Sequence, residues 1–518
     1  MKFDLRLVLV LIVFVIVGAS LVGEYRYQIN PDGISYISVA QKYLAGDFSG
    51  AINGYWGPLY SWLLMPFLYL GIEPLLATKV LSLGIGVVTI IALWRLSYRF
   101  EMAESIRTVV LLAAVPAVLT FGFFYITPDG LLTCIILFYL SVIFGADYGA
   151  GVRKGVVCGA LGGAAYLSKS FGFPFFISHF VVINVLGFVR SESGEARKNI
   201  VHNFLAGAAA FAVISGIWIG LISNKYGKLT FGTSGKTTYR AAASPGAQGS
   251  AVLWIGFLEP SNETAISVWE DPSYVKVPPP ETMDLWSYFR HQMKVVGRHG
   301  RKIAGFCMEF SPLVLAIGVA YVLFWLRRFN IKAMRAEVLY PTITVALMAG
   351  AYSLVWVRDR YLYVIFMLLM LMGGYVLGRL FESNFFTKTR RWALLFVFFL
   401  SFVVPASQSL KAKAGMGKGI YGLSQAFKKV IEPGRHIVSN SSWAASLYMA
   451  YYLDCRYYGA QKKDISRTEL ERQLREYEID YYIAWGGGPV DVALLSGYPE
   501  ITGGRIPGLR IYGLKGRR

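Results

Sequence analysis

Residues 30–65 read NPDGISYISVAQKYLAGDFSGAINGYWGPLYSWLLM and lie between two long apolar segments. The stretch opens on Asp32 after Pro31, continues with apolar residues at helical spacing, and ends in an aromatic, glycine-rich turn that contains Tyr55 and Trp56. A carboxylate at the edge of a membrane, backed by helices that can lie in the interface, predicts a functional site. The alternative is an ordinary first loop in which Asp32 caps a helix.

The composition indicates a membrane protein. Of the 518 residues, 55% are hydrophobic and only 16% are charged, and the mean hydropathy is +0.48. A soluble globular domain carries about 25% charged residues. Many separate apolar runs of about 20 residues predict a polytopic helical protein. Cytoplasmic loops and anionic headgroups explain the net charge of +20, and the sequence contains no recognisable nucleic-acid-binding module.

The apolar runs predict about eleven transmembrane helices, and the loops between them predict their orientation. The loops at alternate ends of the spans are rich in lysine and arginine, so the positive-inside bias places them in the cytoplasm. The N-terminus is then cytoplasmic, as an uncleaved signal anchor. Residues 24–73, 223–302 and the tail are external, at the outer face of a cytoplasmic (inner) membrane. The predicted spans are residues 5–23, 74–96, 106–124, 128–146, 154–168, 172–190, 200–222, 303–326, 336–356, 361–379 and 391–408.

This topology predicts that the chain has two domains. Residues 1–408 form a transmembrane domain, and residues 409–518 form an external soluble domain. From about residue 432 the tail alternates strand-like and helix-like segments, which predicts a small α/β domain. We interpret glycines 486–488 as a turn rather than a phosphate-binding loop. In the long external loop, residues 272–281 contain four prolines and are predicted to lack regular structure.

The cysteines do not indicate a disulfide framework or a zinc site. The chain has four cysteines and no CxxC motif.

Several charged residues depart from the positive-inside pattern, and all of them fall on the external side. Asp129 stands at the start of a span, where a helix N-cap is the alternative interpretation. Lys169 lies in a very short turn between two spans, where its side chain can instead snorkel to the interface. Arg358 and Arg360 flank Asp359 just before a late span.

A basic run lies before the eighth predicted span. Its cations recur four residues apart on one helix face, at Arg290, Lys294, Arg298 and Lys302. Arg301 belongs to the same run. Because an external basic run opposes the topology rule, it predicts an anionic ligand, which arginine and lysine bind well when it carries phosphate. A juxtamembrane anchor on anionic lipid is the alternative.

Together these groups suit the transfer of a group from a lipid phosphate. Cations hold the phosphate and neutralise the charge that develops as it leaves. A carboxylate takes the proton from the attacking acceptor. Because neither a nucleotide sugar nor ATP is available outside the membrane, an activated lipid is the expected donor.

Four motifs carry a resemblance to a known family. PDGISYISVAQKYLAGDFSGAINGYWGPLYSWLL, TPDGLL, YLSKSFGFPFF and RDRYLYVIFMLLML occur in this order over roughly residues 1–400. They resemble the polyprenyl-phosphate-sugar-dependent GT-C glycosyltransferases, in particular the protein mannosyltransferase and aminoarabinose transferase type (glycosyltransferase family 39-like). The resemblance implies an all-α polytopic GT-C membrane fold with interfacial helices in the first external loop. It also implies inverting transfer from an undecaprenyl- or dolichyl-phosphate sugar in a cavity at the outer membrane face.

The resemblance also implies site residues. Asp32 matches the acid of the catalytic loop, but Gly33 replaces the second acid of the usual Asp-Glu pair, so Asp32 is the only acid there. Asp129 matches the second acidic position, and Lys169 matches a lysine after the fifth span. Residues 360–361 match an Arg-Tyr pair before a late span.

We therefore predict a membrane glycosyltransferase that moves one sugar from a polyprenyl-phosphate carrier to a glycan, lipid or protein acceptor. Asp32 is the predicted general base, and Asp129 assists it or orients the acceptor. The predicted ligands of the lipid phosphate are Lys169, Arg298, Arg301, Lys302, Arg358 and Arg360. The predicted aromatic residues of the donor and acceptor cavity are Tyr55, Trp56 and Tyr361.

Two other functions fit parts of the pattern. A glycan or O-antigen type ligase with a pyrophosphate-linked donor would suit the long basic external loop. A transporter of lipid-linked glycans would require charges at mid-span and paired broken helices, whereas here the charges lie at the span ends and no halves repeat. Asp32 and Asp129 can in principle share a divalent cation such as Mg²⁺ or Mn²⁺, but no compact ligand motif requires one, so no metal site is predicted.

Overall fold

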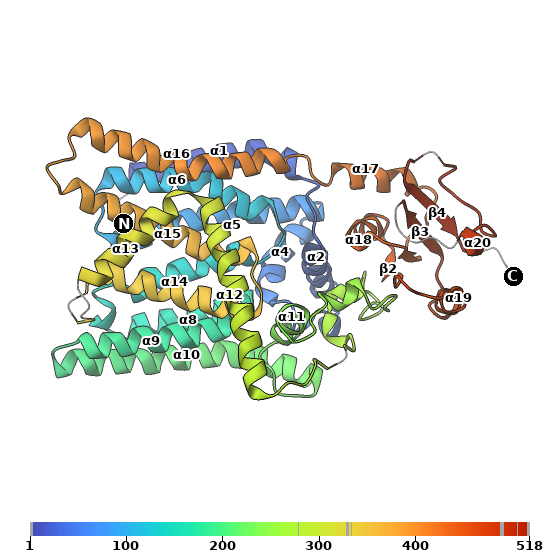
Figure 1. The fold of residues 1–518 in the computed structure, drawn as a ribbon, viewed down its shortest axis with the longest axis horizontal. Helices are drawn as coiled ribbons and strands as arrows, with labels where there is room; N and C mark the ends of the chain where they lie inside the picture. The colour runs from blue at the N-terminus through green and yellow to red at the C-terminus, as the bar shows by residue number, and fades with distance from the viewer. Residues whose placement is uncertain are drawn as a thin grey trace.

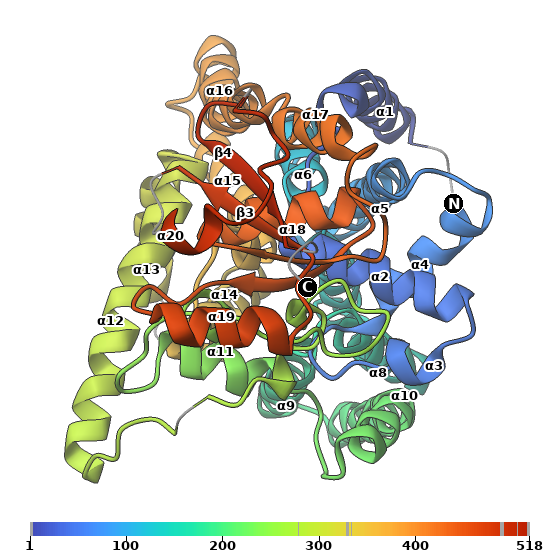
Figure 2. The same ribbon diagram turned by 90° about the vertical axis from the view of Figure 1, so that its right-hand side faces the viewer.

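The computed structural model describes residues 4–277, 279–327, 331–332, 334–486, 492–504 and 506–514. The chain forms a bundle of long helices with a small α/β domain at one end (Figure 1). Figure 2 looks onto this end and shows the sheet and its helices in front of the ends of the bundle. Residue 278 and glycines 487 and 488, for which the sequence made predictions, lie outside the described residues.

The bundle confirms the prediction of a polytopic helical membrane protein. In the described part of the chain, eight helices are long and apolar enough to cross a membrane, or up to nine if a bent pair is one span. Backbone groups inside a bilayer have no water to bind, so helices are the stable form of these apolar segments. The eight are α1 (Leu5–Tyr25), α5 (Pro74–Ser97), α6 (Glu104–Phe123), α9 (Gly172–Arg190), α10 (Gly194–Tyr226), α14 (Ala336–Val355), α15 (Tyr363–Phe381) and α16 (Lys388–Lys413).

Two shorter helices complete this part of the bundle, α7 (Asp129–Ile143) and α8 (Val152–Ser168). Three short 3₁₀ turns lie between bundle helices, namely η1 (Tyr98–Phe100), η2 (Tyr148–Ala150) and η6 (Asp359–Leu362). Every predicted span except the eighth coincides with one continuous helix.

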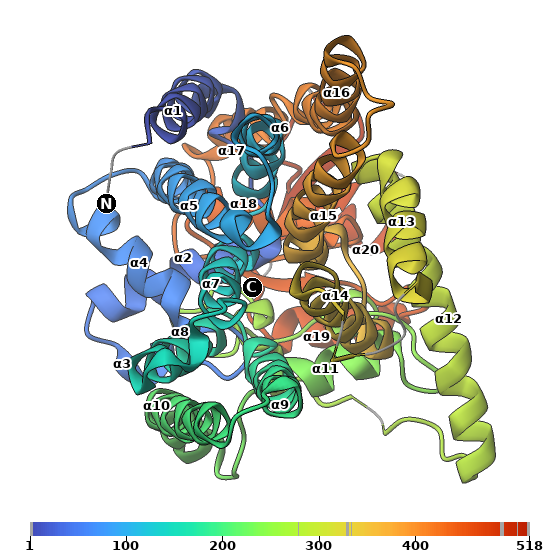
Figure 3. The ribbon, with the colours of Figure 1, turned by 90° about the vertical axis from the view of Figure 1, so that its left-hand side faces the viewer.

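The eighth predicted span, residues 303–326, is not one continuous helix. Helices α12 (Leu285–Phe310) and α13 (Leu313–Arg327) meet at 116°. Helix α12 lies across the bundle helices at the edge of the molecule, as Figures 1 and 3 show. The bend falls at Ser311, whose backbone is extended at φ −163° and ψ 131°. Pro312 explains it, because a proline disfavours the helical conformation of the preceding residue.

The first loop on the side of the C-terminal domain holds α2 (Pro31–Leu44), α3 (Phe48–Ala51) and α4 (Pro58–Tyr69). Helices α2 and α4 both begin with a proline, which is favourable at the first helical position because it has no N–H to leave unpaired. The Ser61 hydroxyl donates to the Tyr36 carbonyl at 2.9 Å and joins the two helices. Helix α2 is buried along most of its length, whereas the end of α4 is exposed at Tyr69 and Leu70.

The long loop before α12 is folded rather than extended. It contains α11 (Ser234–Ala242), η3 (Ala251–Leu253), η4 (Val268–Glu270) and η5 (Pro272–Tyr274). The prediction that residues 272–281 lack regular structure is therefore wrong for their first three residues. The Asp271 carboxylate accepts the Ser273 N–H at 3.2 Å and starts the η5 turn.

The C-terminal domain confirms the predicted α/β class. Its sheet has the order β2-β1-β3-β4, in which β1 is parallel to β2 and β3 and only β4 is antiparallel. Helices α18 and α19 make the crossovers that parallel strands require. The elements are α17 (Lys418–Phe427), β1 (His436–Ser439), α18 (Trp443–Tyr452), β2 (Arg456–Ala460), α19 (Arg467–Glu476), β3 (Tyr481–Trp485), α20 (Val492–Leu495) and β4 (Leu509–Gly513).

The long loop attaches this domain to the bundle. The Tyr457 N–H donates to the Ile266 carbonyl at 2.7 Å, and the Leu258 N–H donates to the Tyr458 carbonyl at 2.7 Å. Both bonds lie on the outer edge of β2, which would otherwise expose unpaired backbone groups. The loop that carries η4 is thereby held between the sheet and the bundle.

Candidate active site

A cavity of about 770 Å³ lies where the bundle meets the C-terminal domain. Its walls come from the starts of α2 and α7, the turn between α8 and α9, helix α11, η4, η6 and the start of α18. Eight of the predicted site residues line it together: Asp32, Tyr55, Trp56, Asp129, Lys169, Arg358, Arg360 and Tyr361. Segments far apart in the sequence thus meet in one place.

Asp32 is held by two donors from other segments. The Arg360 guanidinium donates to one carboxylate oxygen, with an Nη2–Oδ2 distance of 2.6 Å. The Trp269 indole N–H donates to the other, with an Nε1–Oδ1 distance of 3.1 Å. The N-cap of α2 is Asn30 rather than Asp32, so the capping interpretation of Asp32 is not what the structure shows.

The absence of a side chain at position 33 has a steric cause. A Cβ atom on Gly33 would lie 2.6 Å from the Cβ of Ile126. The two segments are also joined by the Ile126 N–H, which donates to the Asn30 side-chain oxygen at 2.8 Å. A second acid at position 33 would therefore separate the start of α2 from the segment that leads to Asp129.

Asp129 is buried, with 4% of its surface exposed, and three donors surround it. Lys169 Nζ lies 2.5 Å from Oδ1, the Thr127 hydroxyl 2.9 Å from Oδ2, and Arg360 Nε 3.6 Å from Oδ2. The N-cap of α7 is Pro128, so Asp129 is not an N-cap either. Arg360 consequently bridges the two carboxylates, Asp32 and Asp129.

Lys169 and Arg358 also line the cavity. Lys169 Nζ lies 3.7 Å from the centre of the Tyr361 ring, and the Arg358 guanidinium lies over Trp356 at 5.1 Å. Arg358 is exposed and makes no ion pair with any carboxylate in the described part of the chain. It lines the cavity beside Asp359.

Aromatic residues form one wall of the cavity. Trp269 is central to it, with ring-centre distances of 5.9 Å to Tyr55, 6.1 Å to Trp56 and 5.9 Å to Trp443. Burial and the Asp32 carboxylate raise the pKa of the Tyr55 phenol, so this group remains a neutral hydroxyl. Sequence reasoning did not identify Trp269 or Trp443, because nothing local distinguishes them from other loop and helix tryptophans.

A buried ion pair holds Trp269 in position. Glu270, its neighbour in η4, accepts from Lys42 Nζ and, at 2.5 Å, from the Ser38 hydroxyl. Lys42 and Glu270 side chains are only 5% and 3% exposed. The Asn53 side chain donates to the Glu270 carbonyl at 2.7 Å. Helix α2 therefore carries Asp32 and also the partners that fix the donor to Asp32.

Three predicted phosphate ligands lie elsewhere. Arg298, Arg301 and Lys302 are exposed on α12 and do not line the cavity. Their assignment to the carrier phosphate remains a prediction without geometric support.

The Arg360 guanidinium bridges the two acids, with Nη2 2.6 Å from Asp32 Oδ2 and Nε 3.6 Å from Asp129 Oδ2. Among the described residues, no group of three or more His, Cys, Asp or Glu side chains comes together that could hold a metal ion.

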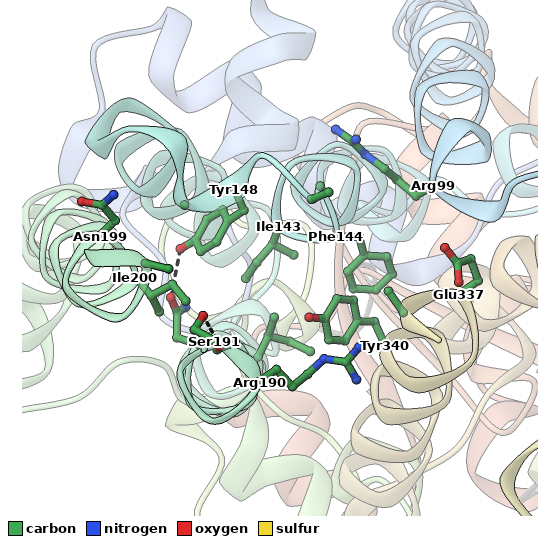
Figure 4. Close-up of a pocket in the computed structure, with 18 of the residues that line it drawn as sticks. Arg99, Ile143, Phe144, Tyr148, Arg190, Ser191, Asn199, Ile200, Glu337 and Tyr340 are labelled. Carbon is green, nitrogen blue, oxygen red and sulfur yellow. Dashed lines mark hydrogen bonds between the residues drawn. The ribbon is translucent and has the colours of Figure 1, made fainter. Parts of the chain in front are cut away.

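A second large cavity, of about 730 Å³, lies at the opposite end of the bundle (Figure 4). Its arginines already have backbone partners. Arg190 donates to the Ile331 and Met334 carbonyls at 2.5 and 2.7 Å, and Arg99 donates to the Ser141 carbonyl at 3.0 Å. None of the predicted site residues lines this cavity, so the first cavity is the candidate active site.

Comparisons with known proteins agree with this fold. Residues 56–219 match the family model described as dolichyl-phosphate-mannose-protein mannosyltransferase. A search of the curated proteins finds no match.

Solved structures give a match over nearly the whole chain. ArnT from Cupriavidus metallidurans bound to undecaprenyl phosphate is 14% identical, with a TM-score of 0.59 and 97% of each chain covered. Its apo state is 13% identical, with the same TM-score and coverage. The oligosaccharyltransferase of Archaeoglobus fulgidus, tethered with an acceptor peptide, is 10% identical with a TM-score of 0.56, and the match covers 92% of this chain and 69% of that one. The chain therefore has the GT-C membrane fold, and the resemblance predicted from its motifs is confirmed.

Proposed function

We propose that this GT-C membrane protein is an inverting glycosyltransferase that moves one sugar from a polyprenyl-phosphate carrier to an acceptor hydroxyl or amine. One observation carries the proposal. Two buried carboxylates, Asp32 and Asp129, are interleaved with Arg360 and Lys169 in a cavity at the membrane-facing end of the C-terminal domain. Such a cavity offers a base for the acceptor and cations for the departing phosphate.

Arg358 and Lys169 are the proposed ligands of the donor phosphate. Arg358 is exposed, lines the cavity and lacks a carboxylate partner in the described residues. A phosphate can therefore form an ion pair with it without displacing another group. Lys169 is 21% exposed on its side chain and presents the remaining donors of its ammonium group. As the sugar leaves, the carrier phosphate gains negative charge, and these cations stabilise it.

Asp32 is the proposed general base. The acceptor oxygen or nitrogen attacks the anomeric carbon, its proton passes to the Asp32 carboxylate, and the bond between the anomeric carbon and the phosphate oxygen breaks with its electron pair on the phosphate. A single displacement of this kind inverts the anomeric centre. Trp269 and Arg360 fix the direction of the carboxylate.

Asp129 is better suited to positioning than to proton transfer. Its two oxygens accept from Lys169 and Thr127, and Arg360 lies 3.6 Å away, so it has less capacity left for an acceptor. It sets the spacing between Lys169 and Arg360. This narrows the role predicted from the sequence, which left Asp129 as an assistant to the base or as a ligand of the acceptor.

The charge of the cavity favours a monophosphate donor. Its lining contains three cations, Lys169, Arg358 and Arg360, and three carboxylates, Asp32, Asp129 and Asp359. A polyprenyl-phosphate sugar carries one negative charge, whereas a pyrophosphate-linked donor carries two and would meet more repulsion from the same acids. The ligase with a pyrophosphate-linked donor is for this reason the second choice.

A neighbouring pocket of about 470 Å³ offers a route for the acceptor from the aqueous side. It shares Thr237, Ala241, Gly249 and Ser250 with the active-site cavity, so α11 and the loop after it separate the two only partly. The pocket is rich in hydroxyl groups, and its cations are Lys228, Lys236 and Arg240. These side chains suit a polar acceptor that carries negative charge.

Release of free polyprenyl phosphate is the decisive measurement. The protein is reconstituted in liposomes with a panel of undecaprenyl-phosphate-linked pentoses and hexoses and, separately, with pyrophosphate-linked sugars. Native membranes supply the acceptor. We expect release from a monophosphate donor by the natural chain and by an Asp464→Asn control, which removes an exposed acid of the C-terminal domain. We expect none from Asp32→Asn. Equal release by natural chain and Asp32→Asn, or no release from any donor, would overturn the proposal.

A further inference from the structure

Helix α12 is placed as a helix on a membrane surface rather than as a span. Its 26 residues extend for about 39 Å. The helix runs across the bundle helices in Figure 1, and in Figure 2 it lies along the outer edge of the molecule. Its bend of 116° into α13 keeps it in this orientation. A helix that crosses the spans at their end meets the headgroup region of the leaflet on that side.

One face of α12 packs against the protein. Val295, His299 and Cys307 are buried along it. His299 Nδ1 lies 2.9 Å from the Ser353 carbonyl, and the Gln292 side chain donates to the Leu354 carbonyl at 2.9 Å. These contacts hold α12 against the end of α14, whose last residue is Val355.

A second face is apolar and largely open to the surroundings. Trp286, Phe289 and Met293 are 62%, 50% and 46% exposed. At about 100° per residue these three side chains fall within one narrow sector beside the buried face. Large exposed apolar side chains in this arrangement fit the acyl-chain boundary of a bilayer.

A third face carries only positive charge over most of its length. Its members are Arg290, Lys294, Arg298, Arg301 and Lys302, all of them exposed. At about 100° per residue they cover roughly one third of the helix circumference, next to the apolar sector. None of them makes an ion pair with a carboxylate in the described part of the chain. Five unneutralised cations on one face repel one another, so they favour an anionic partner.

We propose that α12 binds anionic phospholipids of the leaflet on the side of the C-terminal domain. The phosphates would lie along the five cations, here called the basic face, and the acyl chains would lie along Trp286, Phe289 and Met293. The basic face is a row of exposed point charges rather than a cavity, which fits several mobile headgroups better than one carrier molecule. Phe306 of the same helix lines the active-site cavity, so α12 carries both the proposed lipid site and part of the cavity wall.

The test counts the lipids that the protein retains. The full chain is reconstituted in nanodiscs of phosphatidylcholine mixed with phosphatidylglycerol, and native mass spectrometry measures the phosphatidylglycerol retained after extraction. The variant Lys294→Gln, Arg298→Gln, Arg301→Gln should bind this lipid less tightly, by about fivefold for each cation removed. A charge-conserving variant, Arg298→Lys with Arg301→Lys, should retain it as the natural chain does.

The matched control removes three exposed lysines of the C-terminal domain, Lys428→Gln, Lys429→Gln and Lys463→Gln, and should leave retention unchanged. Thermal unfolding midpoints in detergent verify that each variant is folded. Unchanged retention in the α12 variant would overturn the proposal. So would selective retention of undecaprenyl phosphate over phosphatidylglycerol by the natural chain, because α12 would then be a docking site for the carrier. Neither readout depends on sugar transfer.

Discussion

The Trp269 indole N–H donates to the Asp32 carboxylate at 3.1 Å, although the two residues lie 237 positions apart in the sequence. The bond joins a loop that precedes α12 to the first turn of α2. It fixes one oxygen of the proposed base, and Arg360 fixes the other at 2.6 Å. The orientation of Asp32 therefore depends on Trp269, and no motif in the loop around Trp269 identifies this residue.

Replacement of Trp269 by phenylalanine should keep the aromatic wall and remove only this donor. A hydrogen bond to a charged group contributes about 1.5–3 kcal/mol, so kcat should fall roughly tenfold to a hundredfold. Kinetics of polyprenyl phosphate release measure the effect. Trp485→Phe is the matched control, because its indole N–H donates to the Ser446 hydroxyl inside the C-terminal domain at 2.8 Å. A Trp269→Phe enzyme with the natural kcat would contradict a role in orienting Asp32.

Replacement of Asp32 and replacement of Asp129 should have different effects on activity and on stability. Asp32→Asn should abolish transfer and change stability little, because Arg360 keeps Asp129 as a partner. Asp129→Asn should leave the partly buried Lys169 without its carboxylate, which costs about 3–5 kcal/mol for a buried pair.

The second variant is therefore expected to have a clearly lower thermal unfolding midpoint and a higher KM for the donor. Unfolding curves in detergent, together with kcat and KM measured separately, distinguish the two roles. If both variants lost only kcat at unchanged stability, the positioning role of Asp129 would be wrong.

Gly33 should be intolerant of even one added carbon. Gly33→Ala places a Cβ 2.6 Å from the Ile126 Cβ, and overpacking of this kind costs about 1–3 kcal/mol. The unfolding midpoint and the transfer rate should both fall. The double variant Gly33→Ala, Ile126→Ala makes room for the methyl group and should recover part of both losses. Failure of the double variant to improve on Gly33→Ala would show that the Ile126 contact is not the cause.

Removal of divalent cations should leave transfer intact. Arg360 bridges Asp32 and Asp129, so we expect its positive charge to take the place of a shared metal ion. Sugar transfer measured in EDTA should equal that in Mg²⁺ or Mn²⁺. A loss of activity in EDTA that either cation restores would contradict this expectation.

Much of the candidate site was predictable from the sequence. Asp32, Asp129, Lys169 and Arg360 stand at ends of apolar runs, and the positive-inside pattern places all these ends on one side of the membrane. Residues at the same ends of neighbouring spans have only a small volume in which to lie, so their meeting in one cavity follows from topology. The basic run at residues 290–302 is predicted on the same side of the membrane, but it lies on a helix at the edge of the bundle and does not reach the cavity.

The sequence by itself determined every span except the bent pair α12–α13, and it determined the alternating class of the tail, because apolar length and period are local properties of the chain. Only the tertiary structure decided that Trp269 and Trp443 complete the cavity, and that Gly33 is required by Ile126. Such contacts depend on how the loop before α12 and the C-terminal sheet pack on the bundle, which hydrogen bonds such as that from Tyr457 to Ile266 hold in place. The packing of distant segments depends on the whole fold, so it cannot be predicted from the sequence of any one segment.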